Sequence, residues 1–239
     1  MKGKLLVGIH INRNGLFTPF AFKFIEILRV NEIDWIKLNI NDPDFWDKVK
    51  LCSHVIFHWG GFPDSNNLAK SFMPIIQKYL NIPVFPNDVT AWHHDDKVRQ
   101  FYLLKANNFP VVETKILWNK TDALNFLKDA NIPLIFKLKP SAGSKDVMLC
   151  KNKYQANRVA KRIFSSGIFL GNIPGNNSIK VKDYSFKKVL DQFVKRMYRK
   201  LKGKDVNLQW QKEKNYVLFQ KFLPNNNYDT RVTIIGDKA

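Results

Sequence analysis

The chain has 239 residues, of which 45% are hydrophobic and 13% aromatic, and its formal net charge is +19 at pH 7. This composition supplies enough apolar side chains for one or two folded domains and argues against intrinsic disorder. Cys52 and Cys150 lie in apolar runs, which predicts buried thiols in a reducing compartment rather than a disulfide scaffold. No apolar run approaches the roughly 20 residues of a transmembrane helix, and no signal peptide opens the chain, so a cytoplasmic location is expected.

The positive charge is concentrated in one segment. Residues 1–144 carry 18 basic and 13 acidic side chains (net +5), residues 145–221 carry 19 and 5 (net +14), and residues 222–239 carry 2 and 2. The basic segment includes Phe186–Leu201, whose spacing predicts an amphipathic helix with a face rich in lysine and arginine. Such a face is either the solvated side of a packed helix or a surface for a polyanion or an anionic membrane.

Short apolar runs alternate with amphipathic stretches over residues 1–87. The predicted strands are Leu5–Ile11, Asp34–Ile40, Val55–Trp59 and Pro83–Phe85, and the predicted helices begin at Thr18-Pro19 or cover Asp44–Leu51 and Ser65–Leu80. The first helix is expected to bury Phe20, Phe24, Ile27 and Leu28. Alternation of this kind is typical of parallel βαβ units in a doubly wound sheet. No GxGxxG sequence follows the first strand, so a dinucleotide site is not supported.

Polar residues follow two of these strands, at the edge where such sheets bind ligands. His10, Asn12 and Arg13 follow the first strand, and His58 with Gly60-Gly61 ends the third. Packing in a turn or core is the commoner role of such histidines, and we favour it here.

The second half begins with a helix predicted over Asp88–Ala106. His93, His94, Asp95 and Asp96 are consecutive, so they fan around a helix and do not predict a metal site. The remaining predicted elements are strands at Phe109–Leu117, Pro133–Leu138, Tyr216–Leu223 and Tyr228–Ile235, helices at Thr121–Ala130 (capped by Thr121) and Tyr154–Phe164, and a loop at Gly167–Ser178.

The stretch Ile135–Val147 combines a strand with a loop of small residues. Lys137 and Lys139 are two apart, so a strand places both on one face, and Pro140–Ser144 follows at once. Lysines beside such a loop predict a phosphate site, although the sequence is not a Walker A motif. An edge strand with exposed lysines and a hairpin turn is the alternative.

Several spaced elements together resemble the ATP-grasp superfamily, most closely its RimK-like carboxylate–amine ligases of surface-polysaccharide gene clusters. They are Asp96-Lys97 near a helix start, Pro133–Lys137, Tyr216–Leu223 and Tyr228–Val232, in this order. The resemblance covers about Asp88–Ala239 and implies an α/β chain in three parts. These are a pre-ATP-grasp parallel-sheet domain (1–87), an α+β ATP-grasp N-lobe with a basic helical insertion (88–223, insertion about 170–214) and the start of a C-lobe (224–239).

The resemblance also implies roles for individual residues. Lys97 and Lys137 match the two lysines that hold ATP phosphates, and Lys139 is expected to face the same way. Ser141, Gly143 and Ser144 fall in the mobile loop over the phosphates, which here has a single glycine. Gln220, Lys221, Phe222 and Leu223 match the segment whose backbone binds adenine, Asp229 matches the ribose-binding acid, and Arg231 matches a catalytic arginine.

ATP and Mg²⁺ are the cofactors that this family implies, and its substrates are a small-molecule or glycan carboxylate and an amine; nucleic acid is not among them. The family's magnesium ligands follow the strand that contains Asp229 and Arg231, so they are expected beyond Ala239. The sequence therefore predicts a truncated fragment that binds ATP weakly and does not ligate. A non-catalytic basic module that uses Lys180–Lys214 to bind a polyanion, nucleic acid or a membrane surface is the alternative.

Overall fold

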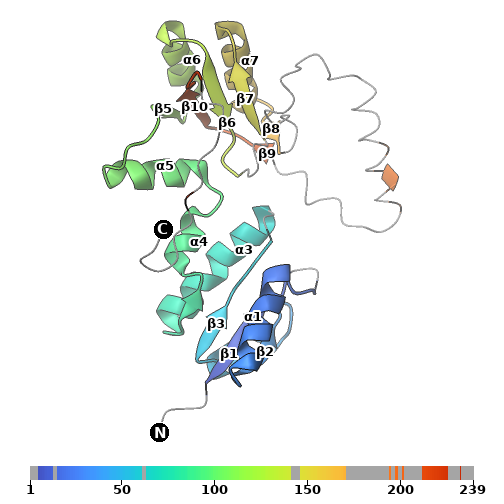
Figure 1. Cartoon of the computed structure of the whole chain (residues 1–239). Helices are drawn as coiled ribbons and strands as arrows, with labels where there is room; N and C mark the ends of the chain where they lie inside the picture. Colours follow the sequence, from blue (N-terminus) through green and yellow to red (C-terminus); the bar gives the residue numbers. More distant parts are fainter. Residues whose placement is uncertain are drawn as a thin grey trace.

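The computed structural model describes residues 5–12, 15–60, 63–140, 146–170 and 212–225, together with five single residues, Val194, Met197, Tyr198, Leu201 and Val232. The described part contains a four-stranded sheet near the amino terminus and a second four-stranded sheet beyond it in the chain (Figure 1). Helices α4 (Asp88–His93) and α5 (Lys97–Ala106) lie between the two sheets in this view.

The first sheet is parallel throughout, with strand order β2-β1-β3-β4. Its strands are β1 (Leu6–His10), β2 (Asp34–Leu38), β3 (His54–Ile56) and β4 (Val84–Phe85). Gly8 in β1 has no room for a side chain, because an added Cβ atom would lie 2.4 Å from Leu38 Cδ1. The predicted parallel α/β arrangement is confirmed.

Helices α1 (Pro19–Val30), α2 (Phe45–Leu51) and α3 (Pro63–Pro74) accompany this sheet, and α3 continues as a π-helical turn over Ile75–Tyr79. The Thr18 hydroxyl caps α1 by accepting a hydrogen bond from Ala21 N–H (3.2 Å). The predicted buried face of α1 is wrong for Phe20 and Ile27, which are 64% and 57% exposed. The helix turns Ala21, Ile25 and Leu28 inward instead, a set at i, i+4 and i+7.

The second sheet is antiparallel, with order β5-β10-β6-β7. Its strands are β5 (Thr114–Leu117), β6 (Leu134–Lys137), β7 (Val147–Cys150) and β10 (Val217–Lys221). Helices α6 (Lys120–Asp129) and α7 (Lys153–Ile163) cover one face, where Leu127, Ala160, Phe136 and Phe219 belong to a single core cluster. Strand β10 therefore enters between two strands that precede it by about 80 to 100 residues (Phe219 opposite Phe136 and Lys115).

Three predicted elements differ from the structure. The helix predicted over Asp88–Ala106 is broken, because Asp95 has φ = 50° and Asp96 caps α5 by accepting from the Val98 and Arg99 N–H groups. Helix α6 is capped by Asn119, not Thr121, through a 2.8 Å bond from Asp122 N–H. Part of the predicted loop Gly167–Ser178 is a strand, β8 (Ile168–Phe169), which pairs with β9 (Lys212–Glu213).

Other predictions fall outside the described residues. One is the strand at Tyr228–Ile235, of which only Val232 is described, as exposed and without regular secondary structure. The other is most of the basic helix Phe186–Leu201, of which only Val194, Met197, Tyr198 and Leu201 are described, as helical and exposed. Cys52 and Cys150 are buried free thiols, as predicted, and burial raises their pKa values to about 11 and about 12. Among the described residues, no helix has the length and apolar character needed to cross a membrane.

Candidate functional site

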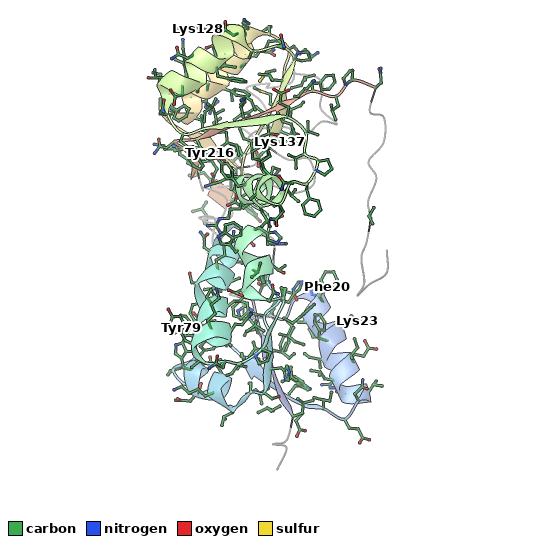
Figure 2. All side chains as sticks on the ribbon, turned by 90° about the vertical axis from the view of Figure 1, so that its left-hand side faces the viewer. Phe20, Lys23, Tyr79, Lys128, Lys137 and Tyr216 are labelled. Carbon is green, nitrogen blue, oxygen red and sulfur yellow. The ribbon has the colours of Figure 1, made fainter. Side chains whose placement is uncertain are left out.

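Lys137 points to the face of the second sheet that α6 and α7 leave uncovered, and its charge acts on Lys97 at the start of α5. Lys137 alternates with Phe136 and Leu138, which are buried in the core, so its side chain points to the opposite face. Figure 2 shows Lys137 on the side of the sheet away from Lys128 of α6. Lys97 is the first residue of α5, and its N–H donates to the Lys139 carbonyl (3.3 Å), which ties α5 to the end of β6.

Both ammonium groups are partly withdrawn from water. Burial lowers the pKa of Lys137, and it lowers the pKa of Lys97, with the Lys137 charge as the next cause. Asp95, Asp146 and Asp96 act on Lys97 in the opposite direction but do not outweigh these two effects. The charge of Lys137 thus acts on a second ammonium group, and the burial of Lys137 carries a desolvation cost that a bound anion would offset.

The hydrogen-bond partner of Lys137 is neutral. Its Nζ atom donates to Gln220 Oε1 at 2.6 Å, and the Gln220 amide donates in turn to Thr114 Oγ1 at 3.1 Å. The Thr114 hydroxyl then donates to the Val112 carbonyl at 2.8 Å. Both ends of the Gln220 amide are therefore fixed, and they orient Lys137 without cancelling its charge.

Lys139 has a different environment, although the strand pattern predicts the same role for both lysines. Its Nζ atom lies 3.5 Å from Glu213 Oε2 and 4.9 Å from the centre of the Tyr216 ring. The Tyr216 hydroxyl accepts a hydrogen bond from Lys139 N–H at 2.8 Å, and burial raises the pKa of that hydroxyl. Glu213 and Tyr216 are only 6% and 1% exposed, so Lys139 is held where β6, β10 and α5 meet.

The other predicted nucleotide residues are described in part. Lys221 N–H donates to the Glu113 carbonyl (2.9 Å), Phe222 is half-buried and Leu223 is exposed, at the end of β10. Ser141, Gly143, Ser144, Asp229 and Arg231 lie outside the described residues, so their roles stay predictions.

Sequence reasoning missed Thr114, Glu213 and the Tyr216 hydroxyl as parts of the site. Thr114 and Gln220 are 106 residues apart, and Lys139 and Tyr216 are 77 apart. Tyr216 was visible only as the first residue of an apolar strand. No local pattern indicates such pairs, because they depend on the register of β10.

Across the part of the chain that the structure describes, no group of three His, Cys, Asp or Glu side chains could hold a metal ion. The described residues therefore do not supply a complete set of Mg²⁺ ligands.

The described polar residues at the carboxyl edge of the first sheet make internal contacts, whereas Arg13 and Gly61 lie outside the described residues. His10 is 1% exposed, stacks on Phe57 with ring centres 3.8 Å apart, and its Nδ1–H donates to the His58 carbonyl at 3.3 Å. His58 Nδ1 and the Thr18 hydroxyl are 2.7 Å apart, and Asn12 Oδ1 accepts from Gly60 N–H at 3.2 Å. The favoured interpretation, packing rather than ligand binding, agrees with these contacts.

Neither a protein-family model nor a curated protein matches this chain. Solved structures do. The chain is 12% identical to an ATP-grasp RimK domain protein of Sphaerobacter thermophilus, over 92% of this chain and 64% of that one, with a TM-score of 0.47. The chain is 10% identical to the phosphoribosylamine–glycine ligase of Thermotoga maritima, over 93% of this chain and 45% of that one, with a TM-score of 0.50. The chain is 14% identical to the biotin carboxylase domain of a 2-oxoglutarate carboxylase of Hydrogenobacter thermophilus, over 92% of this chain and 44% of that one, with a TM-score of 0.46. That domain was solved with MgADP, ADP and bicarbonate.

The chain thus spans between 44% and 64% of the lengths of these three proteins. At such low identity the similarity concerns the fold alone. The phosphoribosylamine–glycine ligase, at a TM-score of 0.50, therefore shows that the two chains are related in fold and no more.

Proposed function

We propose that this chain binds the phosphates of ATP between Lys97 and Lys137 and forms the nucleotide-binding part of an ATP-dependent carboxylate–amine ligase. One observation carries the proposal: Lys137 is half-buried, its hydrogen-bond partner is a neutral amide, and its charge acts on a second half-buried lysine, Lys97, from a distant segment. A polyphosphate is the ligand that best offsets two desolvated positive charges, through short charge-assisted hydrogen bonds.

Further contacts to ATP follow from the family resemblance. The backbone of Lys221–Leu223 would bind adenine, Asp229 the ribose hydroxyls and Arg231 the reacting phosphate or acyl group. The loop that includes Ser141, Gly143 and Ser144 would cover the phosphates. We assign Lys139 a positioning role, because its ammonium group is paired with Glu213 and its backbone connects α5 to β6.

In the proposed reaction a substrate carboxylate oxygen attacks the γ-phosphorus of ATP, which forms an acyl phosphate and releases ADP. The amine nitrogen then attacks the acyl carbon, the C–O bond to phosphate breaks, and an amide and inorganic phosphate form. Lys97 and Lys137 hold the phosphates in line and stabilise the charge that develops on the leaving ADP oxygen. Magnesium, which this fold family uses, would neutralise further phosphate charge, and its ligands would come from outside the described residues.

Finer assignments belong to the same proposal. They are a RimK-like enzyme of surface-polysaccharide synthesis, a glycan or small-molecule acid as substrate, and a cytoplasmic location. The alternative of a basic polyanion-binding module depends on residues 180–214, which are described only in part.

Thermal unfolding with and without Mg-ATP tests nucleotide binding directly. We expect Mg-ATP to raise the melting temperature of the unmodified chain, and Lys97→Ala or Lys137→Ala to weaken ATP binding by about 100-fold, since each removes a charge-assisted bond worth ~2–3 kcal/mol.

Lys128→Ala is the matched control, because it removes an exposed lysine from the far side of the same sheet (Figure 2). The proposal fails if ATP does not stabilise the unmodified chain, or if all three variants bind ATP equally well. Binding rather than turnover is the readout, so the result does not depend on catalytic groups outside the described residues.

A further inference from the structure

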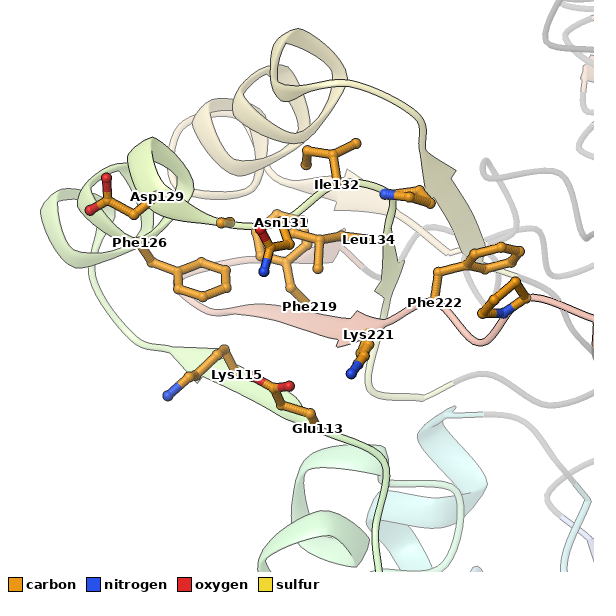
Figure 3. A pocket seen from close by; sticks show the side chains of 13 residues that line it. Glu113, Lys115, Phe126, Asp129, Asn131, Ile132, Leu134, Phe219, Lys221 and Phe222 are labelled. Carbon is orange, nitrogen blue, oxygen red and sulfur yellow. The ribbon is translucent and has the colours of Figure 1, made fainter.

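A cavity of about 520 Å³ opens beside the helix-covered face of the second sheet (Figure 3). Phe219 and Lys221 of β10 line it, whereas Gln220 between them is bonded to Lys137 on the opposite face. Because side chains alternate along a strand, the cavity and the proposed ATP site lie on opposite sides of β10. The cavity thus lies on the other side of β10 from Lys137, and it shares only Lys221 and Phe222 with the segment whose backbone is proposed to bind adenine.

The floor of the cavity is apolar. Phe126 of α6 and Phe219 of β10 have ring centres 6.3 Å apart and ring planes inclined by 27°, and Leu134 of β6 also lines the cavity. The volume of the cavity lies within the range of sites for small organic ligands. An apolar side chain, preferably aromatic, would be buried on this floor.

The rim carries charges of both signs. Lys115 and Lys221 come from the strands, with Glu113 between them, and Asp129 lies at the carboxyl end of α6 (Figure 3). No ion pair joins these four side chains within the described part of the chain. The strand side therefore has a net positive charge, while Asp129 and the negative end of the α6 dipole favour a cation.

We propose that this cavity binds a small zwitterion of dipeptide size with an apolar side chain. The side chain would pack on Phe126 and Phe219, the carboxylate would face Lys115 and Lys221, and the ammonium group would face Asp129 and the end of α6. The proposal does not depend on ATP binding.

Methyl-detected NMR without nucleotide tests it, with L-alanyl-L-phenylalanine as the probe. Ile132 and Leu134 line the cavity, whereas Ile135 points to the face of Lys137, so its methyl groups are an internal control. We expect saturable shifts at Ile132 and Leu134 and none at Ile135. The N-acetylated and the C-amidated dipeptide should each bind about fivefold more weakly, as expected for the loss of one partly exposed ion pair.

Asn131→Trp places a large side chain at an exposed position of the lining and should abolish the shifts. Asn125→Trp, at an exposed position of α6 outside the lining, is the control and should leave them unchanged. The proposal is overturned by an absence of shifts up to the solubility limit, by shifts at Ile135 of equal size, by equal binding of the uncharged analogues, or by retained binding in Asn131→Trp.

Discussion

The parallel sheet buries His10 as a neutral imidazole, whereas the antiparallel sheet half-buries the ammonium groups of Lys97 and Lys137. Burial lowers the pKa of His10 to about 4, so this side chain enters the core uncharged at neutral pH. Its Nδ1–H bonds to a backbone carbonyl and its ring stacks on Phe57. Because its imidazole is neutral, His10 avoids the cost of burying a charge in the first sheet.

The lysines of the second sheet also have lowered pKa values, but the structure provides Lys137 with a fixed neutral acceptor rather than a carboxylate. Lys139, two residues further along, does have a carboxylate, that of Glu213. A desolvated charge without a counter-charge is destabilising in the folded protein and is characteristic of a ligand site. The comparison therefore separates side chains with a packing role, His10 and Lys139, from a candidate binding group, Lys137. Four experiments test this distinction.

The largest effect should come from His10. Its folded pKa of about 4 lies below its usual value of 6.5, so the unfolded state binds the proton more tightly between these values. Stability should fall by about 3 kcal/mol as the pH drops from 6.5 to 4. Urea unfolding of His10→Gln across this range should show a shallower loss, and His54→Gln, at an exposed position, should behave like the unmodified chain. Parallel pH profiles for all three proteins would contradict the assignment.

Replacing the neutral partner of Lys137 should weaken ATP binding. Gln220→Glu places a carboxylate 2.6 Å from Nζ, which pairs with the ammonium group and repels phosphate. We expect ATP affinity to fall about tenfold, or ~1.4 kcal/mol, in calorimetric titrations. Asn125→Asp introduces the same charge on exposed α6 and should change affinity little. An unchanged affinity in Gln220→Glu would show that the neutrality of Gln220 is unimportant.

Tyr216→Phe tests the hydrogen bond between the Lys139 N–H and the Tyr216 hydroxyl. The variant leaves the partly buried Lys139 N–H without the acceptor that now lies at 2.8 Å. The free energy of unfolding should fall by about 1–2 kcal/mol in urea titrations. Tyr79→Phe removes a hydroxyl from a residue that is 80% exposed and should have almost no effect (Figure 2). Equal losses in the two variants would rule out a special contribution of the Tyr216 hydroxyl.

The smallest effect concerns the apo stability of Lys137→Met. Since burial lowers the folded pKa of Lys137 below 10.5, the unfolded state binds its proton more tightly, and stability rises as the pH increases toward 10.5. The methionine variant should lack this rise and should be as stable as the unmodified chain, or more stable, at pH 7. Lys128→Met, on exposed α6, is the control. A clear loss of stability in Lys137→Met alone would mean that this lysine is structural.

Local patterns predicted much of the architecture. The alternation of strands and amphipathic helices before Asp88 predicted the parallel sheet, because one buried face per element is visible within ten residues. The strand that contains Lys137 and the strand Tyr216–Leu223 were also found, and a family resemblance singled out Lys97 and Lys137. The predicted buried face of α1 was wrong by one position and the predicted N-cap of α6 by two. In both cases neighbouring residues fitted the local pattern of apolar or capping residues equally well.

What the sequence determined by itself is therefore the set of elements and the candidate lysines. The different environments of Lys137 and Lys139 were decided by tertiary structure, through the insertion of β10 between β5 and β6. That pairing brings neutral Gln220 to one lysine, and the neighbouring residues Glu213 and Tyr216 to the other. The physical reason is that periodicity is a local property of the chain, whereas the partner of a charge depends on the register of strands more than 70 residues apart.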